Sequence, residues 1–162
     1  MMKNKKGISA IVATVLIILI TVAAVTIIWA AIIPMISNEL GGATECFDAS
    51  AALAVLAEYS CYNTTSVDIQ ISRTSGDFVL LGMNIAGSYL GTSETVEIAK
   101  DDVPNANGAR VYTIGLDGDA GADGNFTLTA IDSASVSARV KSGQTEKLCD
   151  GSAVVSIVEC AA

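Results

Sequence analysis

The chain has 162 residues, 51% of them apolar, and its nine basic and seventeen acidic residues give a net charge of −8. Such an acidic chain repels nucleic acid and anionic membrane surfaces, which argues against both as targets. Histidine is absent, so the commonest general base and the commonest metal ligand are missing. We therefore expect no enzyme, no cofactor and no small-molecule substrate.

The charges are unevenly distributed along the chain. No charged residue occurs from Gly7 to Asn38, and all seventeen acidic residues lie beyond that stretch. Three of the nine basic residues (Lys3, Lys5 and Lys6) precede it. Without the first seven residues, the chain keeps six basic and seventeen acidic residues, a net charge of −11. The sequence thus predicts two unlike parts, an apolar segment and an acidic domain.

The apolar segment runs from Ile8 to Ile36, 29 residues. As a helix it measures about 43 Å, more than the ~30 Å hydrocarbon core of a bilayer. The lysines before it keep the amino terminus cytoplasmic and place the acidic domain outside. A secretory signal peptide has an apolar core of only about 7–15 residues, followed by its cleavage site. Here the basic leader ends before the apolar segment, so cleavage between Gly7 and Ile8 would leave the whole helix on the mature chain.

The predicted helix, residues 8–38, is apolar on all sides, which is typical of a helix buried by lipid or by other helices. Small residues recur along it and allow helix backbones to approach closely. These candidate packing residues are Ser9, Ala10, Ala13, Thr14, Ala23, Ala24, Ala30 and Ala31. Pro34 predicts a kink or an end near the carboxyl end of the helix, and Gly41-Gly42 predicts a turn into the second part.

The segment from Lys5 to Leu16 (KKGISAIVATVL), followed by Ile20–Ala23 (ITVA), resembles the class III signal peptide of archaeal type IV pilins and archaellins. The resemblance covers about the first 36 residues. It implies a signal peptide at residues 1–7, removed by a prepilin peptidase after Gly7, and a helix that becomes the core of a filament. Bacterial pilins carry a glutamate at the fifth mature residue, where this chain has Val12. Many archaeal members lack that acid.

Residues 43–162 are predicted to form a β-rich extracellular domain. Apolar and polar residues alternate there with a period of two, which is typical of half-buried strands. The inward residues of the clearest strands are Val67, Ile69 and Ile71; Val79, Leu81, Met83 and Ile85; Tyr112, Ile114 and Leu116; Phe126, Leu128 and Ala130; Val136, Ala138 and Val140. Shorter candidates are Val96 with Ile98 and the segment Val154–Val158. Seven or eight such strands predict a small immunoglobulin-like β-sandwich, hence an α+β fold class.

Residues 51–59 remain ambiguous between helix and strand. The four cysteines, Cys46, Cys61, Cys149 and Cys160, predict disulfides in an oxidising space. A straight element between Cys46 and Cys61 would hold them too far apart for a bond. Antiparallel pairing of the segments before Cys61 and before Cys160 would join Cys46 with Cys160 and Cys61 with Cys149. We favour this nested pairing, with local pairing (Cys46 with Cys61, Cys149 with Cys160) as the alternative.

Two further motifs have weaker implications. Asp117, Asp119 and Asp123 suggest a calcium loop. However, Gly121 and Leu128 occupy positions where an EF-hand needs ligands. An acidic surface hairpin is therefore the preferred interpretation, and no metal is expected. Asn63 and Asn125 begin possible N-glycosylation sequons.

We therefore expect a pilin, a cell-surface glycoprotein that reaches the outside through the cytoplasmic membrane and polymerises into an archaeal type IV pilus-like filament. Its partners would be copies of itself, the prepilin peptidase, the pilus assembly machinery and, before assembly, the membrane. Adhesion would then be a function of the outer domain. The alternative is a single-pass, membrane-anchored surface or binding protein that does not polymerise. An extracellular hydrolase is the third and least favoured interpretation.

Overall fold

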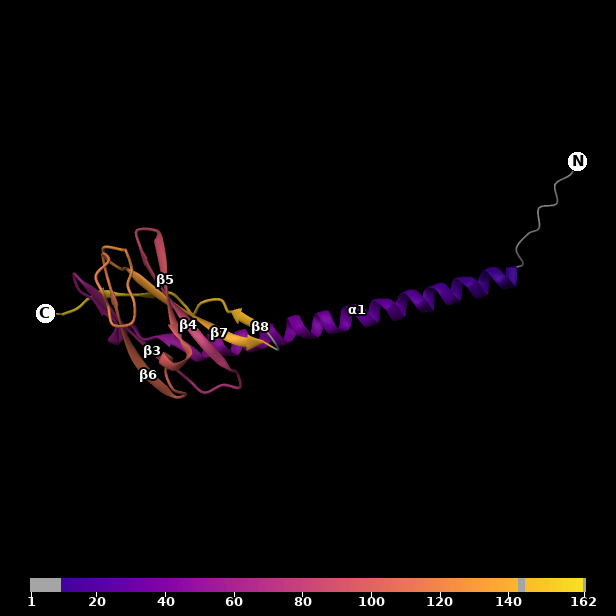
Figure 1. The fold of residues 1–162 in the computed structure, drawn as a ribbon, viewed down its shortest axis with the longest axis horizontal. Coiled ribbons are helices and arrows are strands. Elements are labelled where there is room, and N and C mark those ends of the chain that lie inside the picture. The colour runs from indigo at the N-terminus through magenta and orange to yellow at the C-terminus, as the bar shows by residue number, and fades with distance from the viewer. Residues whose placement is uncertain (1–9, 143–144, 162) are drawn as a thin grey trace, which may run out of the picture. The chain divides into compact units, whose positions relative to one another are not determined.

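The computed structural model describes residues 10–142 and 145–161, with side chains given except at 37–41. The chain divides into two compact units, residues 1–40 and 41–162. Helix α1 (Ala10–Ala52) supplies the described part of the first unit and begins the second (Figure 1). All strands of the described residues belong to the second unit. The fold class is therefore α+β, an apolar helix followed by a mostly-sheet region.

Helix α1 is longer than the sequence predicts. It continues through Pro34 and Gly41-Gly42, so the predicted turn at the glycines is wrong. A proline removes a single backbone donor, and a long helix keeps the hydrogen bonds on either side of it. Beyond the glycines, the second unit holds the helix, because Ala49 is buried and Cys46 is bonded to Cys149. Tertiary contacts have therefore overridden local breaking signals.

The first sheet is built around β3. Its strands are β1 (Leu53–Val55), β2 (Cys61–Tyr62), β3 (Ser66–Arg73), β6 (Gly108–Gly115) and β10 (Val158–Glu159). Strand β6 pairs antiparallel with all of β3, while β1 and β2 pair antiparallel with different parts of β3. Strand β10 pairs parallel with β2. This last pairing decides which cysteines meet.

The second sheet has the order β5-β4-β7-β8, and β9 also pairs with β7. Its strands are β4 (Leu80–Tyr89), β5 (Thr92–Ala99), β7 (Ser133–Ser142), β8 (Thr145–Leu148) and β9 (Val155–Ser156). All pairs in this sheet are antiparallel. A two-residue turn, Leu90-Gly91, joins β4 to β5 at one end of the sheet.

The two sheets and the end of α1 share one hydrophobic core. Burial alternates along β3 and β7, so one face of each strand lies inside. The largest fully buried side chains are Tyr112, Phe126, Leu53, Ile69, Ile71, Met83, Ile85, Ile114, Leu116, Ile131, Val67 and Val136. Burying apolar surface at about 25 cal/mol per Å² is the main stabilising term for such a unit.

Most predicted strands are confirmed. The alternating residues around Ile69, Val96, Ile114 and Val136 lie in β3, β5, β6 and β7. The predicted strand at Phe126–Ala130 is wrong. Phe126 and Leu128 are buried as predicted, but the segment forms no strand, and an isolated bridge joins Gly115 to Asn125, the residue before it. The closing segment Val154–Val158 divides into β9 and the start of β10, in different sheets.

Strand β4 departs from the predicted alternation at its start. Leu80, Met83 and Ile85 are buried, whereas Val79 is 53% exposed and Leu81 is only partly buried. The register between β4 and β7 shifts between Leu80 and Gly82, which marks a β-bulge. An extra residue reverses the side on which the preceding side chains lie. The predicted inward positions of Val79 and Leu81 are therefore wrong.

The ambiguous segment, residues 51–59, is neither one helix nor one strand. Ala51 and Ala52 end α1, Leu53–Val55 form β1, and Ala57–Tyr59 form a 3-10 helix. A turn lies at Asp117-Gly118, where the Asp119 N–H donates to the Leu116 carbonyl at 2.9 Å. Asp117 and Gly118 have φ of 53° and 80°, values that aspartate and glycine tolerate best.

Candidate functional site

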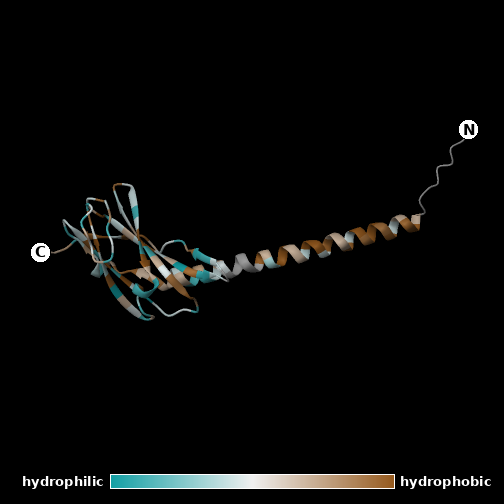
Figure 2. Cartoon of the chain, in the orientation of Figure 1, coloured by the Kyte–Doolittle hydropathy of each residue, from teal (hydrophilic) through white to brown (hydrophobic). Residues whose placement is uncertain are grey.

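The described part of the first unit presents an apolar helix surface, Ala10–Ile36. An 18-residue window within these 27 residues has a mean hydropathy of 3.0, and none of the 27 residues is buried. All are exposed except Ala13, which is half-buried. At about 1.5 Å per residue the segment is about 40 Å long, enough to cross a membrane. Figure 2 shows this stretch coloured as predominantly hydrophobic, whereas the colours alternate along the strands.

Polar groups on the apolar helix surface are bonded within the helix itself. The hydroxyls of Thr14, Thr21 and Thr26 donate to the carbonyls of Ile11, Ile18 and Ala23, each at 2.9 Å. Hydrocarbon surroundings penalise every polar group that lacks a partner. The three threonines thus suit apolar surroundings.

The candidate packing residues divide between two sides of the helix. A helix turns about 100° per residue, which fixes the sides from spacing alone. One side carries Ala10, Ala13, Thr14, Ala24 and Ala31. Ala23 and Ala30 lie on a different side. A helix with small residues on two sides can approach more than one neighbour closely.

The predicted processing site cannot be compared with the structure. Lys3, Lys5, Lys6, Gly7 and Ile8 lie outside the described residues, as does Ser9. Cleavage after Gly7 stays a prediction.

Both predicted cysteine pairings are wrong. The structure joins Cys46 with Cys149 and Cys61 with Cys160, at Cα–Cα distances of 5.1 and 4.9 Å. The nested pairing requires antiparallel segments, but β10 runs parallel to β2, and the Cys160 N–H donates to the Tyr62 carbonyl at 2.9 Å. Cys160 therefore lies beside Cys61. Two disulfides are typical of an oxidising compartment.

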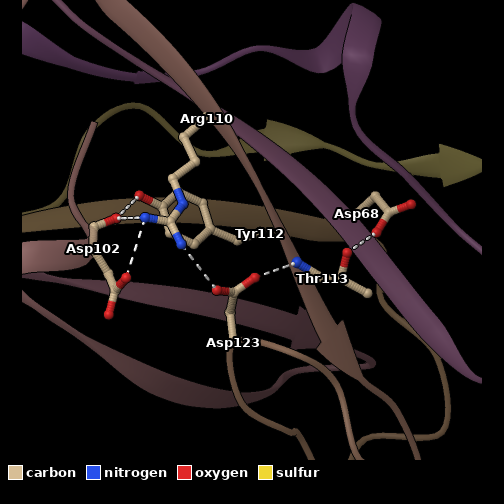
Figure 3. Close-up of polar contacts among 6 residues, drawn as sticks. All are labelled: Asp68, Asp102, Arg110, Tyr112, Thr113 and Asp123. Carbon is tan, nitrogen blue, oxygen red and sulfur yellow. Dashed lines mark hydrogen bonds and ion pairs between the residues drawn. The ribbon is translucent and has the colours of Figure 1, made fainter. Parts of the chain in front are cut away.

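A polar cluster on β6 centres on Arg110 (Figure 3). Its Nη1 donates to the carbonyl and to Oδ1 of Asp102, at 3.0 and 3.2 Å, and its Nη2 lies 3.6 Å from Oδ1 of Asp123. Oδ2 of Asp123 accepts from the Thr113 N–H at 3.0 Å, and the Thr113 hydroxyl donates to Oδ1 of Asp68 at 2.7 Å. Asp102 ends the 3-10 helix Lys100–Asp102, and Asp123 lies in the loop after β6. The cluster ties both segments to the sheet.

Tyr112 forms the buried side of this cluster. Its hydroxyl donates to the Asp102 carbonyl at 2.6 Å, and the Arg110 guanidinium carbon lies 5.3 Å from its ring centroid. Burial raises the pKa of Tyr112 to about 12. The phenol therefore keeps its proton at neutral pH. The bonds of the cluster are those of a structural clamp.

The three residues suggested for calcium are not gathered into one group of possible metal ligands in the described part of the chain. Asp123 is occupied by Arg110 and Thr113. Within residues 10–142 and 145–161, no group of three or more His, Cys, Asp or Glu side chains could hold a metal ion.

The two sequons differ in local structure. Asn63 is exposed, and its Oδ1 accepts from the N–H groups of Thr65 and Ser66, both at 2.8 Å, and from the Thr65 hydroxyl at 3.1 Å. This is an Asx turn leading into β3. In the second sequon, after Asn125, the Thr127 hydroxyl instead donates to the Glu94 carboxylate. Of the two sequons, both within the described residues, the first joins its asparagine to its hydroxyl by a hydrogen bond, whereas the hydroxyl of the second bonds to Glu94.

Sequence reasoning missed the Arg110 cluster and the turn at Leu90. The cluster joins residues far apart in sequence and carries no local pattern. The turn had a signal, because Gly91 lies two residues after the end of β4, and a glycine after alternating residues favours a hairpin turn. Leu90 is 81% exposed with φ of 50°.

No protein-family model, curated protein or solved structure matches this chain.

Proposed function

We propose that the chain is a structural subunit of an archaeal type IV pilus-like filament, anchored in the membrane before assembly. The observation that carries the proposal is the apolar helix surface, 27 residues of high hydropathy with none buried. In water, each exposed Ile, Val or Leu side chain forgoes about 1.5–3 kcal/mol of burial free energy. Such a surface is stable only in lipid or among other helices.

Removal of the leader distinguishes these two surroundings. With Lys3, Lys5 and Lys6 attached, the amino terminus stays at the cytoplasmic face. Cleavage after Gly7 removes all three charges, and the helix can then leave the lipid for contacts with copies of itself. Contacts between unlike surfaces of identical subunits need not close, so they propagate into a fibre. The resemblance to archaeal pilins and archaellins supports the same order of events.

The second unit is the outer, acidic part of this proposed filament, and we assign it an immunoglobulin-like β-sandwich fold. Two sheets around one core and two disulfides support a durable body outside the cell. Asn63, exposed in its Asx turn, is the preferred glycan acceptor. Adhesion, rather than catalysis, is the proposed role of the outer surface, since each carboxylate of the Arg110 cluster is bonded to a protein donor.

The test is the mass of the mature amino terminus, measured on filaments sheared from the cells of the native host. The proposal requires a chain that begins at Ile8 and loss of filaments containing it when the prepilin peptidase is inactivated. A chain that keeps Lys3–Lys6 and stays in the membrane would instead support the tethered surface protein.

A further inference from the structure

The second unit carries a protruding apolar side chain at one end of its second sheet. Leu90 is 81% exposed, more than any other large hydrophobic side chain in the described residues. With Gly91 it forms the two-residue turn between β4 and β5, at φ of 50° and 84°. Two-residue hairpin turns with positive φ at both positions favour Asn-Gly. Leucine is strained at positive φ. A strained residue whose apolar side chain is left exposed by its own chain suggests a contact elsewhere.

An apolar groove lies at the opposite end of the same sheet. It has a volume of about 350 Å³ between the last turns of α1 and β8, with Phe47, Leu148 and the Cys46–Cys149 disulfide in its lining. Phe47 is 74% exposed and Leu148 is 55% exposed.

The register of β4 on β7 shows that the turn and the groove are far apart. Ser88 pairs with Ser133, next to the Leu90 turn, and Leu80 pairs with Val140, close to β8. Seven residue steps along β7 separate these two pairs, about 23 Å at ~3.3 Å per residue. Leu90 therefore cannot reach the groove of its own chain.

Acidic side chains lie near the turn, whereas charges of both signs lie near the groove. Asp132 accepts a hydrogen bond from the Leu90 N–H at 3.4 Å, and Glu94 follows in β5. Lys147 lines the groove beside Asp150, and Lys141 lies in the neighbouring strand. Neither lysine forms an ion pair among the described residues. The unit has sixteen acidic and six basic residues, and two of the six, Lys141 and Lys147, lie at this end, with Glu146 and Asp150 beside them.

We propose that Leu90 of one copy docks into the Phe47–Leu148 groove of a second copy of this chain. A protruding apolar residue and a pocket elsewhere on the same molecule form a contact that repeats without closing. The contact rests on the proposed filament and adds to it a specific bond between outer domains, independent of the helices.

The test uses the full chain in its native host, with Leu90→Asn, Phe47→Ser and the double variant. Losing a buried leucine weakens a contact about tenfold to 100-fold, so each single variant should lower the filament fraction by at least about tenfold. The double variant should be no worse than the worse single variant, because residues in contact couple. Since the two positions are too far apart to couple within one chain, non-additivity reports a contact between copies.

Val154→Asn is the matched control, because Val154 is 70% exposed and belongs to neither feature. It should form filaments at the wild-type level. Leu90→Asn relieves the turn, so thermal unfolding of the detergent-solubilised subunit should occur at the wild-type temperature or above it. Loss of filaments is then not a folding defect.

The outcomes separate the two proposals. Wild-type chain that forms no filament overturns the filament and the contact together. Wild-type filaments with undiminished Leu90→Asn filaments, or additive losses in the double variant, overturn the contact alone.

Discussion

The two units treat apolar side chains in opposite ways. In residues 41–162, Phe126, Ile69 and Met83 are fully buried by the chain itself. In Ala10–Ile36, side chains of the same kind are exposed, Ile20 at 66% and Ile27 at 69%. A folded unit that covers its own apolar surface is stabilised by it, whereas an uncovered helix depends on what surrounds it. Substitutions in the second unit should therefore change the free energy of unfolding, whereas substitutions in the apolar helix should change membrane insertion.

The largest effect is expected in the core of the second unit. Phe126→Ala should lower the free energy of unfolding by about 3–5 kcal/mol, because a fully buried ring leaves a cavity. Phe47→Ala is the matched control with the same chemistry at 74% exposure. Denaturant unfolding of the detergent-solubilised chain measures both. If both variants lost the same free energy of unfolding, burial in the native unit would not determine how much each ring contributes to stability.

A charge in the apolar helix should have the converse effect. Ala23→Asp places a carboxylate near the middle of the segment and should cost about 2.5–3.5 kcal/mol of membrane insertion, on the order of 100-fold. Unfolding of the second unit should not change. Membrane fractionation measures the insertion of Ala23→Asp, with Val154→Asp as the control. Unchanged insertion of Ala23→Asp would refute a lipid-facing role for the helix.

The disulfides sharpen the comparison within the second unit. Cys61 and Cys160 are separated by 99 residues. Replacing both with alanine should lower stability by about 2–4 kcal/mol, because the bond restricts a long loop in the unfolded chain. The variant Cys46→Ala/Cys149→Ala is the counterpart, with a separation of 103. Peptide mapping of the intact chain would contradict the account if it linked Cys61 to Cys149.

The smallest effect is a dependence on pH. Hydrogen bonds from the Thr127 hydroxyl and N–H lower the pKa of Glu94 below its ordinary value of 4.5. The stabilisation is present above pH 4.5 and is lost as pH falls through the lowered pKa. Glu94→Gln should flatten the unfolding profile in that acid range. An unchanged profile would mean that the contact contributes nothing in solution.

Local pattern in the sequence is enough to predict the strands whose burial alternates, such as β3 and β7. It fails where a non-local pairing decides the outcome. The bulge before Gly82 reverses Val79 and Leu81, and only the partner strand reveals it. Phe126 is buried without a regular strand, since individual backbone hydrogen bonds join it to Gly115 and Gly118.

The site divides in the same way. The apolar helix surface can be predicted from composition alone, because an uncharged run of that length has few stable surroundings. Its end cannot be predicted, because the burial of Ala49 carries α1 past Pro34. The disulfide pairing depends on the direction of two-residue strands, β2 and β10, which no alternation marks.

The most direct measurement is a density map of fibres purified from the native host, resolved well enough to trace this chain. The account predicts Ala10–Ile36 of neighbouring copies packed together along the fibre axis, with each amino terminus at Ile8 and the acidic units outermost. Fibres built without this chain, or a chain recovered only from membranes with its lysines in place, would contradict it.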